Sequence, residues 1–390
     1  MKHLDMEFLV FGEDWGRHPS STQHILTTQF KNYDVIWINS IGLRQPTFSW
    51  RDLKRISEKI QASIKPPSDK AFTSLPAHSL KPTAIIKPLV WPLAQNAFVQ
   101  ALNNMILKRQ LRPKKKARVI WAALPSAVDY LKICDSDLVI YYCGDDFSAL
   151  ADVDHDYATQ AEQKLIARAD IILACSPSLK AKFPKEKTWL LPHGVSLSQF
   201  AKPASNPEDI DNSRPSVGFY GSLNDWLDQD LLLRLAKARP NINFYLLGPI
   251  QTNTSKLLQR HNIHLLPAKP HHQLASYLQH WTMAILPFKD NAQIRACNPL
   301  KLREYLAAGC PIISSDFPAV RSYHPIASIA TSNEQWLSAI DHYCHFSTDE
   351  RQAYAQQAQN RVSEESWEQR ANLVTQLIKE QLMYNKSDVN

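Results

Sequence analysis

The chain has 390 residues, more than one ordinary hydrophobic core holds, so we expect two domains. Hydrophobic residues make up 44% and charged residues 21%, which argues against an intrinsically disordered chain, and no apolar run is long enough for a membrane-spanning helix. Six cysteines without a Cys-x-x-Cys pair, and acidic residues near the N-terminus, favour a cytoplasmic protein with no zinc site and no secretory signal.

Apolar strands alternate with helices through the first half of the chain, a pattern that predicts a parallel sheet built from strand–helix–strand units. The predicted strands cover residues 7–12, 34–42, 117–124, 137–143, 170–176 and 188–195. The predicted helices cover residues 22–30, 93–107 and 158–169. We therefore predict a Rossmann-like N-terminal domain over residues 1–200.

Positive charge is concentrated in one part of this domain. The net charge is +7, and residues 44–118 hold sixteen basic and only three acidic side chains. The densest run follows the predicted helix 93–107 and contains Lys108, Arg109, Arg112, Lys114, Lys115, Lys116 and Arg118. Such a run is often a solvated loop, but this excess favours an anionic membrane surface, because no nucleic-acid-binding motif accompanies it.

The second half repeats the strand and helix alternation after a polar, proline-containing linker at residues 201–215. The predicted strands cover residues 216–223, 242–249, 263–268, 283–288, 311–315 and 327–331. We predict a second Rossmann-like domain over residues 216–365 and a C-terminal helix over residues 366–390 that returns to the first domain. Ligands bind beyond the carboxyl ends of parallel strands, so we expect the chemistry in a cleft between two facing sheets.

One stretch, NPLKLREYLAAGCPIISSD at residues 298–316, predicts a short helix followed by a strand. We expect Asn298 to cap the helix and Pro299 to occupy its first turn. Lys301 and Glu304 then share one face near the helix N-terminus, where amide groups and the basic side chain favour an anion. Glu304 is placed to accept hydrogen bonds from vicinal hydroxyls such as those of a ribose. The spacing alone fits an ordinary Lys–Glu helix pair equally well.

Residues 298–316 resemble the donor-binding segment of GT-B glycosyltransferases, especially bacterial enzymes of exopolysaccharide and teichuronic-acid type. The same pattern continues, in the same order, over most of residues 1–30 and 120–380, for example in VIYYCGDDFSAL, LLPHGVSLSQF and VGFYGSLNDWLDQDLL. The resemblance implies the GT-B fold, an α/β architecture of two Rossmann-like domains that face each other across a cleft. It also implies an acceptor site in the N-terminal domain and a donor site in the C-terminal domain.

The resemblance assigns donor-binding roles to particular residues. Glu304 matches the glutamate that holds the nucleotide ribose, and Lys301 matches a basic residue near the diphosphate. The other matching positions are Gly221 and Ser222 near the phosphates, Gly248 and Pro249 near the base, and Asn298 and Leu300 beside the donor. GT-B enzymes stabilise the leaving diphosphate with a helix N-terminus and basic side chains, so we expect no metal and no cofactor.

Two departures from the family pattern bear on the mechanism. Retaining members of the family-4 group carry a second glutamate eight residues before the first, and this chain has Ala296 there. The aspartate usual before the predicted strand 283–288 is replaced by Thr282. The missing glutamate favours an inverting transfer.

An inverting transfer needs a general base that removes the proton of the acceptor hydroxyl. Asp145 and Asp146 follow a predicted strand end, and their mutual repulsion could raise one pKa. We expect one of the two to cap the following helix and Asp145 to be the base. His18, after the first strand, is a second candidate and more in keeping with acceptor binding.

We therefore predict a glycosyltransferase that moves a sugar from a nucleotide-sugar onto a lipid-linked or polysaccharide acceptor in cell-surface polysaccharide synthesis. It would be cytoplasmic and peripheral on the inner membrane face, with no nucleic-acid partner. Ala296 and Thr282 leave open a catalytically degenerate nucleotide-sugar-binding subunit of a polysaccharide assembly complex. A nucleotide-sugar epimerase of the same architecture would leave the basic face unexplained.

Overall fold

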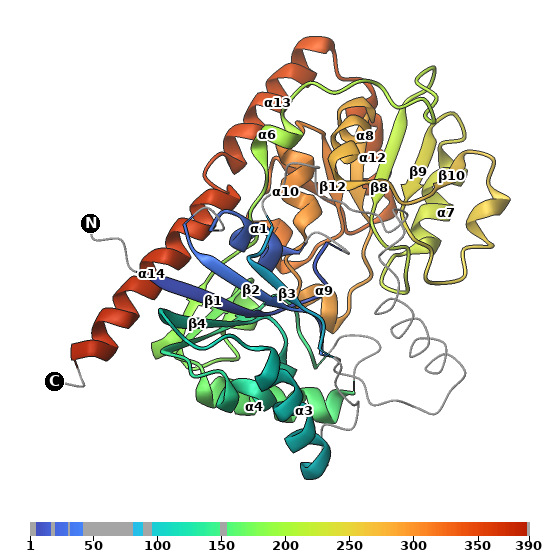
Figure 1. Ribbon diagram of the computed structural model, residues 1–390. Coiled ribbons are helices and arrows are strands. Elements are labelled where there is room, and N and C mark those ends of the chain that lie inside the picture. Colours follow the sequence, from blue (N-terminus) through green and yellow to red (C-terminus); the bar gives the residue numbers. More distant parts are fainter. Residues whose placement is uncertain are drawn as a thin grey trace. The chain divides into compact units, whose positions relative to one another are not determined.

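The computed structural model describes residues 5–16, 20–29, 32–41, 81–88, 96–148 and 154–387. The chain divides into two compact units. The N-terminal unit comprises Met1–Pro192 and Arg370–Asn390, and the C-terminal unit comprises His193–Gln369. Each unit is built on one parallel sheet, as Figure 1 shows for the neighbouring strands β1 and β2 and for β8, β9 and β10.

The sheet of the N-terminal unit has the strand order β3-β2-β1-β4-β5-β6-β7 among its described residues. The strands are β1 (Met6–Phe11), β2 (Asp34–Ile38), β3 (Ala84–Ile86), β4 (Ala117–Ala122), β5 (Leu138–Cys143), β6 (Ile171–Ala174) and β7 (Thr188–Leu190). In the centre, Leu9 pairs with Ile36 on one side and Ile120 on the other, and all three are buried. The sequence pattern predicted every strand except β3, which is a three-residue strand at the edge of the sheet.

Short helices connect these strands. They are α1 (Ser21–Thr27), α3 (Ala97–Gln110), η1 (Pro125–Ile133), α4 (His155–Arg168), α5 (Pro177–Lys180) and η2 (Lys185–Lys187). The 3-10 helix η1 packs against both α3 and α4. Asp154 caps α4 by accepting a hydrogen bond from the amide of Tyr157 (3.1 Å), which fixes where that helix begins.

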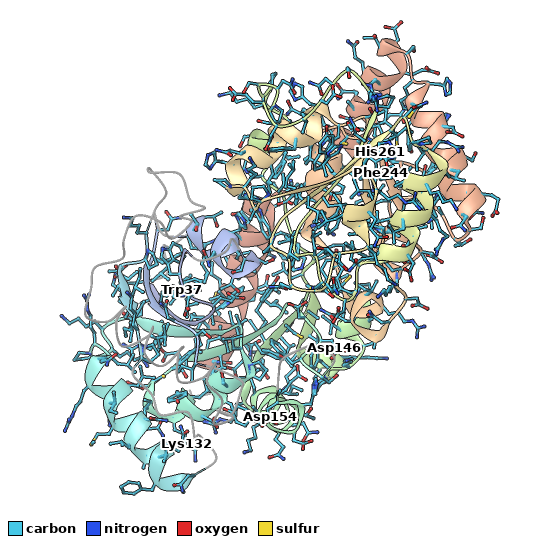
Figure 2. All side chains as sticks on the ribbon, turned by 90° about the vertical axis from the view of Figure 1, so that its right-hand side faces the viewer. Trp37, Lys132, Asp146, Asp154, Phe244 and His261 are labelled. Atoms are coloured by element: carbon cyan, nitrogen blue, oxygen red, sulfur yellow. The ribbon has the colours of Figure 1, made fainter. Side chains whose placement is uncertain are left out.

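The C-terminal unit holds the second sheet, with the order β10-β9-β8-β11-β12-β13. Its strands are β8 (Ser216–Tyr220), β9 (Asn243–Leu247), β10 (Ile263–Leu266), β11 (Met283–Leu286), β12 (Ile312–Ser314) and β13 (Ala327–Ile329). Its helices are α6 (Leu197–Phe200), α7 (Gln229–Ala238), η3 (Leu257–Gln259), η4 (His271–Gln273), α8 (Leu274–His280), α9 (Ala292–Ala296), α10 (Leu300–Ala307), α11 (Pro318–Arg321), α12 (Asn333–Cys344) and α13 (Thr348–Val362). Phe244 of β9, labelled in Figure 2, and Phe219 of β8 are fully buried in its core.

The chain passes between the units at two places, Pro192–His193 and Gln369–Arg370. Helix α14 (Trp367–Ser387) begins in the C-terminal unit, and its residues from Arg370 onward belong to the N-terminal unit. There, the side-chain amide of Gln29 donates to the carbonyl oxygen of Ala371 (3.3 Å). On the C-terminal side, the amide of Val195 donates to the carbonyl oxygen of Glu365 (2.8 Å), so the two connecting segments lie next to each other.

A buried carboxylate fixes helix α10 within the C-terminal unit. Glu365 accepts hydrogen bonds from Arg303 of α10 (2.6 Å), from the hydroxyl of Tyr323 (2.7 Å) and from Arg361 (2.8 Å). Burial alone would raise the pKa of Glu365, but the two guanidinium groups and the hydrogen bonds outweigh burial and lower it. The charged form of Glu365 therefore stabilises the folded unit.

We expect Glu365→Gln to lower the free energy of unfolding by about 3 kcal/mol, because it leaves buried Arg303 without its counter-charge. The matched control is Glu368→Gln, which changes an exposed residue of the same segment and should have little effect. Since the pKa of Glu365 is lowered in the fold, its contribution is present above the ordinary value of 4.5 and is lost as the pH falls through the folded pKa. Urea unfolding of both variants from pH 7 to pH 3 should show the deficit of Glu365→Gln shrinking on acidification. A deficit that is constant with pH would contradict this.

Candidate functional site

The N-terminus of α10 has no side-chain cap. The helix begins at Leu300 with Pro299 in the capping position, and among the described residues no side chain is found to accept from its first amides. The prediction that Asn298 caps this helix is wrong, because its side-chain oxygen instead accepts from Arg303 (2.6 Å). Uncapped amide groups and the helix dipole give this end a partial positive charge, so it favours an anion.

Lys301 adds a full positive charge beside this helix end. Its ammonium lies over the rings of Phe219 (5.5 Å), Trp226 (5.4 Å) and Phe288 (6.0 Å from the ring centroid). Among the described residues it has neither an ion pair nor a hydrogen bond. Desolvation lowers its pKa, and the nearby charge of Glu304 opposes this only in part. A cation in this setting is stabilised by aromatic faces and would be stabilised further by a bound anion.

Two glycine-containing loops pack against each other, and one of them contacts Lys301. Gly221 has a φ of +131°, and a Cβ there would lie 2.4 Å from the Cε of Lys301. Gly248 has a φ of +150°, and its Cβ would lie 2.1 Å from the carbonyl oxygen of Gly221, so neither position admits a side chain. Ser222 and Pro249 follow these glycines, and the carbonyl of Pro249 accepts a backbone hydrogen bond from the first loop (2.9 Å). The structure thus brings together predicted donor residues from three separate segments.

Glu304 lies one turn further along α10 and is only 7% exposed. One carboxylate oxygen contacts Nε2 of His271 (2.7 Å), and the other accepts a hydrogen bond from the hydroxyl of Tyr220. Sequence reasoning missed both partners. Their positions in the sequence could have pointed to them. Tyr220 ends β8 and His271 follows β10, and ligands bind at the carboxyl ends of parallel strands.

In the N-terminal unit, Asp146 is held by its own partners. Its carboxylate forms an ion pair with Lys182 and accepts from the hydroxyl (2.6 Å) and the amide (3.2 Å) of Ser148. Burial alone would raise the pKa of Asp146, but these hydrogen bonds outweigh it and lower the pKa. Asp146, labelled in Figure 2, is held by these contacts and caps no helix in the described part of the chain. The prediction that one of the two aspartates caps the following helix is wrong, because Asp154 caps α4.

Asp145 is different from its neighbour. No hydrogen bond to its carboxylate is found among the described residues. Desolvation by the surrounding protein, followed by the charges of Glu13 and Asp146, raises its pKa to about 6. A carboxylate with this pKa is a stronger base than an ordinary aspartate and is still largely ionised at neutral pH. His18, the second candidate, lies outside the described residues.

Three of the basic residues predicted to face a membrane have partners within the protein. Arg118 is 3% exposed and donates to Glu7 (2.7 Å), so its assignment to a surface is wrong. Lys116 forms ion pairs with Asp5 and Asp34. Lys114 likewise pairs with two aspartates of the η1–β5 loop.

The remaining four members of the basic run are exposed, namely Lys108, Arg109, Arg112 and Lys115. They lie in or just after α3, whose buried face is formed by Asn103 and Leu107. Two large apolar residues of the same helix point away from the core, because Phe98 is 79% exposed and Met105 is 45% exposed. No helix in the described part of the chain is long and apolar enough to cross a bilayer.

Known proteins resemble this chain in sequence and in fold. Residues 229–376 match a family described as glycosyl transferase-like. Over 245 residues the chain is 28% identical to TuaH of Bacillus subtilis (strain 168), whose name assigns it to teichuronic acid biosynthesis as a glycosyltransferase. That match covers 54% of this chain and 62% of the length of TuaH.

The fold is shared with solved structures at low sequence identity. HepE from Anabaena, solved with UDP-glucose, has a TM-score of 0.66 at 12% identity, over 97% of this chain and 100% of HepE. A glycosyltransferase from Rickettsia africae has a TM-score of 0.68 at 12% identity, over 98% of this chain and 99% of that protein. Residues 229–376 therefore match a glycosyl transferase-like family, and the two parallel-sheet units have the GT-B fold.

Proposed function

We propose that this protein is a glycosyltransferase that moves a sugar from a nucleotide-sugar onto a lipid-linked or polysaccharide acceptor in cell-surface polysaccharide synthesis. The observation that carries the proposal is Lys301, a cation with no ion pair among the described residues, at the uncapped start of α10. A diphosphate supplies the missing negative charge, and Glu304 one turn away accepts the hydroxyls of an attached ribose. HepE was solved with UDP-glucose, so UDP-sugars are the first donors to test.

In the proposed reaction, the acceptor hydroxyl attacks the anomeric carbon with inversion. The carboxylate of Asp145 takes the hydroxyl proton as the new C–O bond forms and the bond to the diphosphate breaks. The nucleoside diphosphate leaves with the electron pair, and its charge is stabilised by Lys301 and the amides of α10. Ala296, which stands where retaining enzymes of the resembling group carry a second glutamate, supports inversion.

Replacing Lys301 with Met keeps an apolar stem under the aromatic rings and removes the charge. We expect the affinity for UDP to fall about 10- to 100-fold, because a charge-assisted contact contributes about 1.5–3 kcal/mol. The readout is the rise in melting temperature with UDP, GDP and dTDP, which also selects the base. The exposed Lys237→Met is the matched control and should bind as wild type does. Equal nucleotide binding by Lys301→Met and wild type would refute the donor site.

Asp145→Asn should reduce kcat/KM for transfer about 10²- to 10⁴-fold, the usual range for loss of a general base. Because the base must be ionised and its pKa is about 6, wild-type kcat/KM should fall as the pH drops below about 6. Asp146→Asn removes the partner of Lys182 and should reduce activity much less. Rates measured from pH 5 to pH 8 check this assignment, and full activity of Asp145→Asn would sink it.

A second candidate function is a nucleotide-sugar-binding subunit without catalysis. Ala296 and Thr282 favour it, since both replace acidic residues of the resembling group. The two proposals differ in turnover. A protein that binds nucleotide-sugar through Lys301 but releases no nucleoside diphosphate with any polyprenyl-linked or polysaccharide acceptor supports the subunit.

We further propose that α3 and the segment after it meet the cytoplasmic face of an anionic membrane, where a lipid-linked acceptor would be found. Four exposed basic residues beside exposed Phe98 and Met105 support this. Basic side chains attract acidic lipid, and an apolar ring adds burial in the interface.

The double variant Arg109→Ala/Lys115→Ala should weaken binding to vesicles of phosphatidylglycerol and phosphatidylcholine about 30-fold, because each of the two basic residues contributes about 1 kcal/mol near acidic lipid. Co-sedimentation measures it, and added salt should abolish the difference. Lys237→Ala/Lys256→Ala removes the same charge from exposed positions of the C-terminal unit and serves as control. Vesicle binding that both double variants weaken equally would contradict a dedicated surface.

A further inference from the structure

His271 is the least explained group at the donor site. It opens the 3-10 helix η4, directly after Pro270, and its side chain is 14% exposed. Its Nε2 lies 2.7 Å from one carboxylate oxygen of Glu304. Its ring also packs edge-on against Phe200 of α6, with centroids 5.5 Å apart and planes at 76°. The ring is thus fixed by contacts on more than one side.

Gln199 of α6 determines which ring nitrogen carries the proton. The side-chain amide nitrogen of Gln199 lies 3.0 Å from the carbonyl oxygen of His271 and 3.1 Å from Nδ1 of the same residue. A carbonyl oxygen only accepts hydrogen bonds, so the NH₂ end of Gln199 faces His271, and Nδ1 is then the acceptor of the second bond. The ring proton therefore sits on Nε2 and is donated to Glu304.

We propose that His271 is a positioning residue for ribose recognition: through its Nε2–H it holds Glu304 in the orientation that binds the hydroxyls of the donor nucleotide. This inference rests on the proposed function. Each carboxylate oxygen can accept more than one hydrogen bond, so a carboxylate that is held by protein donors can also accept the hydroxyls of a ligand. Tyr220 holds the other oxygen, so the two residues fix the carboxylate plane between them.

The roles of the two holders are distinct. Tyr220 ends strand β8 within the core, whereas His271 sits on a short connection between β10 and α8 and is itself oriented by α6. A Glu304 carboxylate that lost the His271 contact would keep its place in α10 and its hydrogen bond from Tyr220 but would be held less firmly in its present orientation. Ribose binding would then weaken without loss of the fold, because the backbone of α10 is held separately through Arg303.

The experiment compares His271→Leu with His271→Gln by calorimetric titration with two ligands, UDP and inorganic pyrophosphate. Leucine fills the space without a donor, whereas the side-chain amide of glutamine can reach the position of Nε2. We expect His271→Leu to bind UDP about tenfold more weakly, the usual size for loss of a hydrogen bond to a charged group, and pyrophosphate as wild type does. His271→Gln should recover most of the UDP affinity. In the transfer assay, His271→Leu should raise the KM for the donor and leave kcat nearly unchanged.

The pyrophosphate arm separates positioning from general damage, because pyrophosphate has no ribose for Glu304 to hold. A loss of affinity that is equal for both ligands, or equal in His271→Leu and His271→Gln, would overturn the proposal. So would wild-type UDP affinity in His271→Leu. If wild-type protein binds neither UDP, GDP nor dTDP, the proposed function itself fails, and this inference fails with it.

Discussion

The proposed donor site depends on one unbalanced charge. Lys301 is held under three aromatic rings, where desolvation disfavours its charged form, and no described side chain neutralises it. A protein selected only for stability would place a carboxylate there or an apolar residue. Gly221 packs against the lysine and Gly248 packs against Gly221, so neither glycine can carry a side chain beside the positive charge. The desolvation that disfavours the charged form of Lys301 is thus the same feature that would favour a bound anion in the proposed site.

Arg303 connects the uncapped start of α10 to the hydrogen bonds that stabilise the C-terminal unit. It is buried, joins Glu365 on one side, and on the other takes the side-chain oxygen of Asn298 that would otherwise cap α10. The same guanidinium therefore anchors the body of the helix and leaves its first amides uncapped. Because Arg303 anchors the body of the helix, the first amides can remain uncapped without unwinding the first turn. Glu304, between the two ends, is oriented by His271 and Tyr220.

Local sequence patterns predicted much of the fold. Continuous apolar runs such as residues 138–143 predicted the buried parallel strands, and their order in the chain predicted two sheets. The specific partners of side chains could not be predicted from local spacing. The hydrogen bond between Asn298 and Arg303 replaced a predicted cap, and the buried pairing of Arg118 with Glu7 removed one residue from a predicted surface. The contact of His271 with Glu304 joins residues from different segments, which spacing along one helix does not predict. Spacing predicts which residues share a face, but tertiary packing decides what that face meets.

The route of the chain through α14 has a consequence for biosynthesis. Residues 370–390 belong to the unit that the first 192 residues begin, and the whole C-terminal unit is encoded between them. During synthesis on the ribosome, the N-terminal sheet is therefore complete before α14 exists, and it lacks this helix until the C-terminal unit has been made. A gene divided at residue 192 would not encode the complete N-terminal unit in either piece. The C-terminal unit, in contrast, is one continuous segment and can fold before α14 is complete.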